Sequence, residues 1–244
     1  YLGKTQGAIF DVVDLERVEI LRGPQGTLYG RNTLGGAINL ISQRPNGSGV
    51  ETKLTLGNYG LTQAQFTTDF EIADGTYGKL VVNSKERDGY VHNAPGPYGG
   101  AQGVVPSADP TVNELDTINS HGFRFTIARD TDKSSFDLSV DYNDQSNTPP
   151  FAQLGYTIPN WSAAFGVGAS PATGGLKLWP IELYTSKGRA KVAHVNEAVF
   201  EKSEVSGIAL TYSRDTNLGT VKAILARRDT EWSDNLDLDG GPFP

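Results

Sequence analysis

From about residue 50 onward, apolar and polar residues alternate one by one, and this period-2 pattern is the feature that most limits the fold. In the segment 134–143, SSFDLSVDYN, every second residue is apolar. The apolar residues are Phe136, Leu138, Val140 and Tyr142, and the polar ones between them are Ser135, Asp137, Ser139, Asp141 and Asn143. Successive side chains of an extended strand point to opposite faces, so this segment predicts a β-strand with one apolar and one polar face.

Other segments predict strands of the same kind. The clearest are QAQFTTDFEI at 63–72, HGFRFTIAR at 121–129 and EVSGIALTYS at 204–213. Weaker alternation is present at 50–57, 78–87 and 220–231. Together with 134–143, these segments predict about seven strands.

The connections between these segments alternate in length after a first tight turn, GNYG at 57–60. Short connections lie near 73–77, 130–133 and 215–219, whereas long ones lie near 88–117 and 146–202. All the long loops are therefore expected at one end of an antiparallel sheet. Short turns at one end and long loops at the other are typical of outer-membrane barrels, whose strands need ~9–11 residues to span the apolar band. A soluble β-sandwich also alternates in this way and stays open as the alternative.

Composition excludes several other classes of protein. No apolar run approaches the ~20 residues that a membrane-spanning helix needs. The formal net charge of −7 argues against a general nucleic-acid binder. Cysteine is absent, which excludes disulfides, thiol nucleophiles and cysteine metal sites. Methionine is also absent and the sequence starts and stops in mid-pattern, so we expect it to be part of a longer polypeptide.

A second feature is the glycine-rich stretch VEILRGPQGTLYGRNTLGGAINLISQRP at 18–45, which lies between two apolar runs that predict strands. A Walker phosphate loop is excluded because Gly26 and Gly30 are too close together and Arg31-Asn32 follows where Lys-Ser or Lys-Thr is required. The dinucleotide fingerprint is absent as well. Glycines of this density favour a compact, turn-rich unit.

The stretch resembles the end of the plug domain of TonB-dependent outer-membrane receptors. The matching residues are the E-R-V-E-[IV]-L-R-G-P core at 16–24, the Y-G pair at 29–30 and the G-G-x-I-N group at 35–39. The similarity continues into LTLGNYG and ERDGYVHN, which resemble the first barrel strands and the tip of the third.

This resemblance implies a mostly β chain. Residues 1–48 would be the C-terminal part of an α+β plug domain, and residues 49–244 the N-terminal part of a plugged antiparallel transmembrane β-barrel with extracellular loops. The predicted strands would be about seven of roughly 22.

The resemblance also implies a function. We expect a protein of the bacterial outer membrane that is not an enzyme, uses no cofactor and takes up a scarce substrate, by default an iron–siderophore complex. Uptake would be powered by the TonB energy-coupling complex, through an N-terminal box that this chain lacks. Other expected partners are outer-membrane lipid, lipopolysaccharide and a small substrate such as a metal chelate, with no nucleic acid. A passive outer-membrane porin and a soluble β-sandwich binding or adhesion protein stay open as alternatives.

Particular residues receive roles from the same resemblance. A polar lock between plug and barrel wall is expected to involve Glu16, Arg17, Glu19, Arg22 and Arg31. The plug turn motif is expected to consist of Gly23, Pro24, Gly26, Tyr29, Gly30, Gly35 and Gly36. Tyr1 and Leu2 resemble a plug loop that faces the outside, where family members contact substrate.

No catalytic or metal site is expected. The histidines are His92, His121 and His194, and their spacing fits no metal motif. The acidic run Asp229, Glu231, Asp234, Asp237 and Asp239 is interpreted as a solvated loop rather than a cation site.

Overall fold

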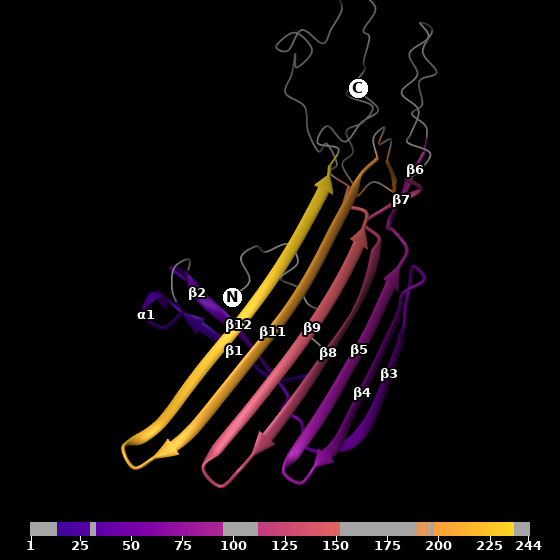
Figure 1. Ribbon diagram of the computed structural model, residues 1–244. Helices are drawn as coiled ribbons and strands as arrows, with labels where there is room; N and C mark the ends of the chain where they lie inside the picture. Colours follow the sequence, from indigo (N-terminus) through magenta and orange to yellow (C-terminus); the bar gives the residue numbers. More distant parts are fainter. Residues whose placement is uncertain are drawn as a thin grey trace, which may run out of the picture. The chain divides into compact units, whose positions relative to one another are not determined.

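The computed structural model describes residues 14–29, 33–94, 112–151, 189, 191–193, 195 and 198–236 (Figure 1). The chain separates into two compact units. The first unit comprises residues 1–86, 119–145 and 202–232, and the second comprises 87–118, 146–201 and 233–244. The predicted division of the chain into plug and barrel parts at residue 48 stays a prediction.

The first unit begins with a small antiparallel hairpin. Strand β1 (Leu15–Arg22) and strand β2 (Gly36–Ser42) are joined through the helical turn α1 (Gly26–Tyr29). Glycine is required at both strand ends. Gly23 has a φ of 83°, and at Gly36 (φ 144°) an added Cβ would lie 2.4 Å from the carbonyl oxygen of Leu21.

The rest of the first unit is the larger part of a seven-stranded sheet in the order β12-β11-β9-β8-β5-β4-β3 (Figure 1). Its strands are β3 (Ser48–Leu56), β4 (Thr62–Ala73), β5 (Thr76–Arg87), β8 (Ile118–Asp130), β9 (Ser134–Asn147), β11 (Phe200–Thr216) and β12 (Gly219–Asn235). The prediction of seven strands is confirmed. Several strands are longer than predicted: β11 starts at Phe200 and ends at Thr216, because the apolar alternation fades at strand ends where charged residues enter.

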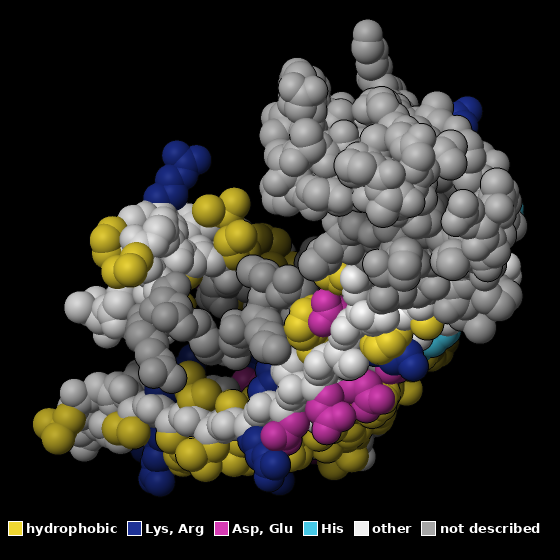
Figure 2. Space-filling view, turned by 90° about the horizontal axis from the view of Figure 1, so that it is seen from above, with side chains coloured by type: hydrophobic (Ala, Val, Ile, Leu, Met, Phe, Trp, Pro, Cys, Tyr) yellow, Lys and Arg dark blue, Asp and Glu magenta, His cyan; other side chains and the backbone are white. Residues whose placement is uncertain are grey.

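The two faces of this sheet differ as the alternation predicts. Cross-strand pairs such as Asp69 with Lys79 and Arg124 with Asp141 place charged side chains on one face. The opposite face exposes large apolar side chains, among them Phe66, Phe123 and Val140. Figure 2 shows hydrophobic side chains along one side of the sheet. In the described residues no helix is long and apolar enough to cross a membrane.

The second unit contains a separate three-stranded sheet in the order β10-β6-β7. Its strands are β6 (Val91–Asn93), β7 (Glu114–Leu115) and β10 (Val192–Ala193). An apolar core is formed by residues of these strands and of the segments next to them: Val91, Val112, Leu115, Ala193, Val195 and Val199. Parts of the two long connections predicted from sequence are therefore folded against each other.

Candidate functional site

The charged residues expected to form the plug–barrel lock pair with each other on the hairpin. Arg17 Nε donates to Glu19 Oε1 at 2.8 Å, and Arg17 Nη1 donates to Glu16 Oε1. Asn39 on β2 donates from Nδ2 to Glu19 Oε2 at 3.1 Å. The hydrogen bond from Arg17, followed by that from Asn39, holds the pKa of Glu19 below its usual value. This group lies at the surface, where such pairs contribute little to stability.

The other predicted site residues are distributed as follows. The carbonyl of Arg22 accepts a hydrogen bond from Gln25 Nε2 at 3.3 Å. The turn residues Gly23, Pro24, Gly26, Tyr29, Gly35 and Gly36 lie in and between β1, α1 and β2. Tyr1, Leu2, Gly30 and Arg31 lie outside the described residues. The role of Glu16, Arg17, Glu19, Arg22 and Arg31 as a lock stays a prediction.

The structure reveals a different contact region, which sequence reasoning missed. The segment 42–46, here called the connector, joins the hairpin to β3 and contacts the polar face of the sheet. At its centre, Lys79 of β5 points its Nζ at Asp14 Oδ2 (3.0 Å) and Asp69 Oδ2 (3.3 Å). The Lys79 side chain is only 4% exposed, and it also donates to Gln43 Oε1 at 3.3 Å. A buried cation is thus enclosed by two carboxylates and an amide.

Asp14 and Asp69 also hold the backbone of the connector. The amide of Gln43 donates to the Asp14 carbonyl at 2.9 Å, and the amide of Asn46 donates to Asp69 Oδ1 at 3.1 Å. Burial raises the pKa of the Asp14 carboxyl, and this effect exceeds the opposing effect of Lys79. Asp14 and the connector, which lie at the two ends of the hairpin, are therefore held at one place on the sheet.

Arg44 makes a second attachment. Its guanidinium donates in a bidentate manner to Asp130 at 2.6 and 2.9 Å, and its Nε donates to Asp137 Oδ1 at 2.7 Å. The hydrogen bond to Asp130 raises the pKa of Arg44 further above its usual value. The planar guanidinium suits this arrangement because it can serve two carboxylates at once. Arg44 thereby ties the connector to β8 and β9.

A third attachment uses a row of side chains that crosses four strands. Arg124 of β8 donates to Ser42 Oγ, and its Nη2 lies 3.8 Å from Asp141 Oδ1 on β9. Arg228 of β12 donates to the same Asp141 oxygen at 2.9 Å. Asp141 is 7% exposed, so its charge is balanced by two arginines within the sheet face.

The second unit is organised around Asn93, which sequence reasoning also missed. Its Nδ2 donates to the carbonyls of Val112 (2.9 Å) and Val195 (3.1 Å), and its Oδ1 accepts from the amide of Val195 at 2.9 Å. Nearby, Arg87 lies 3.9 Å from the centroid of the Tyr90 ring and donates to the Tyr90 hydroxyl at 2.6 Å. Asn93 thus joins segments of the two long connections. It is the last residue of the ERDGYVHN segment at 86–93, but the resemblance of that segment assigned it no role.

Of the residues weighed as metal ligands, the structure describes His92, His121, Asp229, Glu231 and Asp234, and the three acids lie in strand β12 rather than in the expected loop. Among these, no cluster of metal-ligating side chains is present. His121 lies beside Ser84 Oγ at 3.1 Å, whereas His194, Asp237 and Asp239 lie outside the described residues.

Comparison with known proteins agrees with this architecture. Residues 1–37 match the family model described as the TonB-dependent Receptor Plug Domain. The chain is 35% identical over 80 residues to the catecholate siderophore receptor Fiu of Escherichia coli K12, which covers 32% of this chain and 10% of that protein. It is 30% identical over 144 residues to the pesticin receptor of Yersinia enterocolitica, which covers 54% of this chain and 20% of that protein. The crystal structure of the ferric yersiniabactin uptake receptor FyuA from Yersinia pestis superimposes with a TM-score of 0.62 at 19% identity, covering 91% of this chain and 29% of that one.

These findings define the class of the protein as an outer-membrane β-barrel with a plug. More particularly, residues 1–37 match the plug domain of TonB-dependent receptors, and the chain is similar to siderophore receptors of that family in sequence and in fold. The predictions of family, fold class, outer-membrane location and a non-enzymatic role are confirmed, and the soluble β-sandwich is excluded. The chain spans 10 to 20% of the length of these two curated relatives.

Proposed function

We propose that the protein containing this chain takes up an iron–siderophore complex across the outer membrane, in a step powered through TonB. The similarity to Fiu, a catecholate siderophore receptor, supports this substrate class. The observation that carries the transport proposal is the connector, because it ties the end of a plug segment to the polar face of the sheet. A segment held in this way can keep a plug attached to its barrel while other parts of the plug move.

The strengths of the contacts suggest which part moves. The pairs among Glu16, Arg17 and Glu19 are exposed and cost little to separate, because water replaces each partner. The contact of Lys79 with Asp14 and Asp69 is buried, and separating it would leave uncompensated charges. Force that arrives from an N-terminal TonB box would therefore displace the hairpin before the connector.

Within this proposal, the predicted lock depends most on Arg22 and Arg31. Glu16, Arg17 and Glu19 already pair on the hairpin, whereas the guanidinium of Arg22 has no carboxylate within ion-pairing distance in the part of the chain that the structure describes. We expect Arg22 and Arg31 to meet acidic residues of barrel strands beyond the seven. Tyr1 and Leu2, on the outward side of the plug, are proposed to contact substrate, and the glycine-rich turn motif to let the plug fold compactly.

Uptake of radiolabelled ferric siderophores by a strain that lacks its own receptors tests the proposal. The full-length protein should restore uptake of a catecholate complex, and deletion of tonB should abolish it. The variant Arg22→Gln should lower uptake, whereas Lys53→Gln on β3 should not. Uptake that persists without TonB would instead support a passive porin. TonB-dependent uptake of cobalamin, an oligosaccharide or an aromatic compound would support the proposal of energised transport but overturn the proposed substrate class.

A further inference from the structure

Most arginines of the described segments form an ion pair with a carboxylate, but three do not. Ion pairs with a carboxylate are formed by Arg17, Arg44, Arg87, Arg124, Arg189, Arg227 and Arg228. The other arginines of the described segments are Arg22, Arg129 and Arg214, and no carboxylate within those segments lies at ion-pairing distance from them. Arg22 belongs to the hairpin, whereas Arg129 and Arg214 belong to the sheet.

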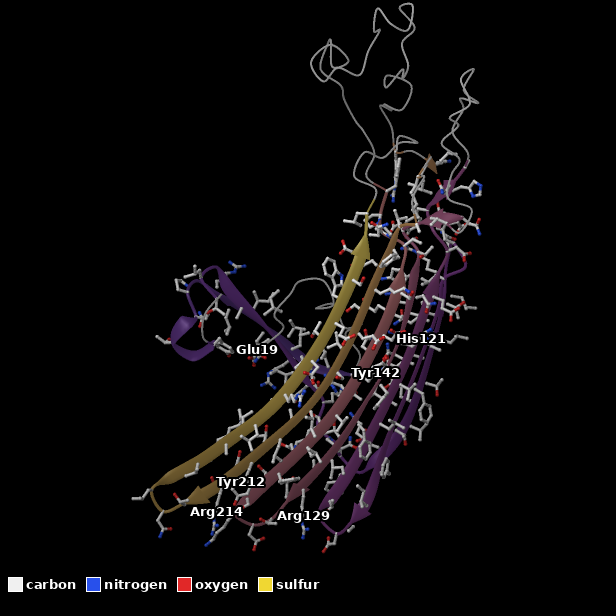
Figure 3. All side chains as sticks on the ribbon, turned by 45° about the horizontal axis from the view of Figure 1, so that its top comes forward. Glu19, His121, Arg129, Tyr142, Tyr212 and Arg214 are labelled. Atoms are coloured by element: carbon white, nitrogen blue, oxygen red, sulfur yellow. The ribbon has the colours of Figure 1, made fainter. Side chains whose placement is uncertain are left out.

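Arg129 and Arg214 lie on the same face of the sheet, at the end that carries the short turns. Arg129 is paired with Phe136 in the β8–β9 ladder, whereas its neighbour Asp130 is paired with Ser135 and faces Arg44. Arg214 lies two residues from Tyr212, whose hydroxyl is 3.4 Å from Ser134 Oγ. Figure 3 places Arg129, Tyr212 and Arg214 near the lower ends of β8 and β11. Their face is the apolar one, which in an outer-membrane barrel is turned to lipid.

These side chains form a cluster around the start of β9, here called the rim cluster: Arg129, Ser134, Tyr212 and Arg214. Arg214 and Tyr212 are alternate residues of β11, so their side chains lie on the same face of the strand, and the Tyr212 hydroxyl is 3.4 Å from Ser134 Oγ. Because β8 and β11 flank β9, the two arginines are roughly 10 Å apart across the sheet, a gap that their long side chains can close around one phosphate group. Both arginine side chains are exposed.

Of the acidic residues next to the cluster in sequence, Asp132 in the β8–β9 turn forms no ion pair with Arg129 or Arg214 in the described segments, and the other two have partners of their own. Asp130 receives both hydrogen bonds of the Arg44 fork, and Asp215 accepts from Thr220 Oγ1 at 2.6 Å. An arginine at the edge of hydrocarbon needs an anionic partner, because burial of an unpaired charge is costly. Phosphate is the anion whose oxygens match the guanidinium fork.

We propose that the rim cluster binds the phosphate of an anionic glycerophospholipid in the periplasmic leaflet of the outer membrane. The short turns place the cluster at the periplasmic boundary of the bilayer. The phosphate lies between Arg129 and Arg214 and accepts from the Tyr212 hydroxyl, while the acyl chains run along the apolar face beside Phe136. A soluble anion would gain nothing from that apolar surface, so the site selects lipid.

Native mass spectrometry of the delipidated full-length receptor in detergent micelles tests this proposal. The probes are phosphatidylglycerol and phosphatidylethanolamine. The wild type should retain phosphatidylglycerol about tenfold more strongly than phosphatidylethanolamine, since each arginine near a membrane surface contributes attraction to anionic lipid. The double variant Arg129→Gln/Arg214→Gln should lose this preference. The control Arg227→Gln removes an arginine that already pairs with Asp229 at 3.0 Å, and it should keep the preference.

Heat-modifiable mobility on gels establishes that each variant still forms a barrel. Lys replacements at both arginines should retain part of the preference, because charge remains while the fork is lost. An unchanged preference in the double Gln variant would overturn the site. Competition by inorganic phosphate at equal concentration would overturn the assignment to lipid.

Discussion

Arg228 on β12 donates to Asp141 on β9 at 2.9 Å although β11 runs between their strands, and Gly207 is the residue of β11 that makes this possible. An added Cβ at Gly207 would lie 2.7 Å from Arg228 Nη2 and 3.0 Å from Asp141 Oδ2. Because Gly207 has no side chain, the Arg228 side chain has room to pass over β11 and reach Asp141. Its role concerns space and not backbone conformation.

The variant Gly207→Ala should weaken the Arg228–Asp141 contact and lower the free energy of unfolding by about 1 kcal/mol. Urea unfolding of the full-length receptor in detergent micelles measures this. Arg228→Gln should cost a similar amount, and the double variant should cost little more than either single change, because both remove one interaction. Additive losses would show that Gly207 acts independently of Arg228.

Lys79→Met should be the most damaging change at the connector. It leaves Asp14 and Asp69 in a buried site without their cation, at a cost of about 3 kcal/mol. Hydrogen exchange at the amides of Gln43 and Asn46 should accelerate by roughly a hundredfold, since the Asn46 amide bonds to the Asp69 carboxylate and the Gln43 amide to the backbone carbonyl of Asp14. Lys53→Gln on β3 is the control and should leave both amides protected. Equal exchange in both variants would contradict the role assigned to Lys79.

Two acidic residues of the plug segment should give opposite pH dependences. The pKa of Asp14 is raised above 3.8, so its contribution to stability is complete below that pH and is lost as pH rises through the folded value. The pKa of Glu19 is lowered from 4.5, so its contribution is complete above that pH and is lost on acidification. As pH falls from 7 to 3, the urea midpoint of the wild type should rise relative to that of Asp14→Asn. Over the same range it should fall relative to that of Glu19→Gln. Parallel slopes for the two variants would refute this.

Arg44→Lys should behave almost like Arg44→Gln. A lysine cannot keep the fork to Asp130 and the bond to Asp137 together, so charge alone does not rescue the contact. Because Arg44 is 40% exposed, the expected cost is about 1 kcal/mol, seen as roughly fivefold faster exchange of the Asn46 amide. Full protection in the lysine variant would mean that only the charge matters.

The sequence predicts the strands well because alternation is a local property. Phe136 to Tyr142 alternate with acids and serines, and that pattern alone determines which face is polar. The hairpin around Gly23 and Gly36 was equally accessible, since glycine marks the positions where φ is positive.

The contacts of the connector were not accessible from sequence for a physical reason. In the sequence, Lys79 is indistinguishable from the other residues of a polar strand face. Nothing near it in the chain indicates that Asp14, 65 residues earlier, contacts it. The same holds for Arg44 and Asp130, which are separated by 86 residues. The polar lock was assigned to the hairpin charges because the family resemblance lies in their local motif, whereas the buried contact depends on long-range strand pairing.

Asn93 gives the last prediction, which concerns the second unit. Replacing Asn93 with alanine leaves three backbone groups without partners, two carbonyls and the Val195 amide, in a site where Asn93 is 6% exposed. The local free energy of opening should fall by about 2 kcal/mol. Hydrogen exchange of the full-length receptor should then accelerate together in 91–93, 112–115 and 191–195. Asn93→Asp should fail as well, because a carboxylate cannot donate to the carbonyls of Val112 and Val195, whereas His92→Ala, a change at an exposed position, should leave exchange unchanged. If only 91–93 were affected, Asn93 would not be what holds the two long connections together.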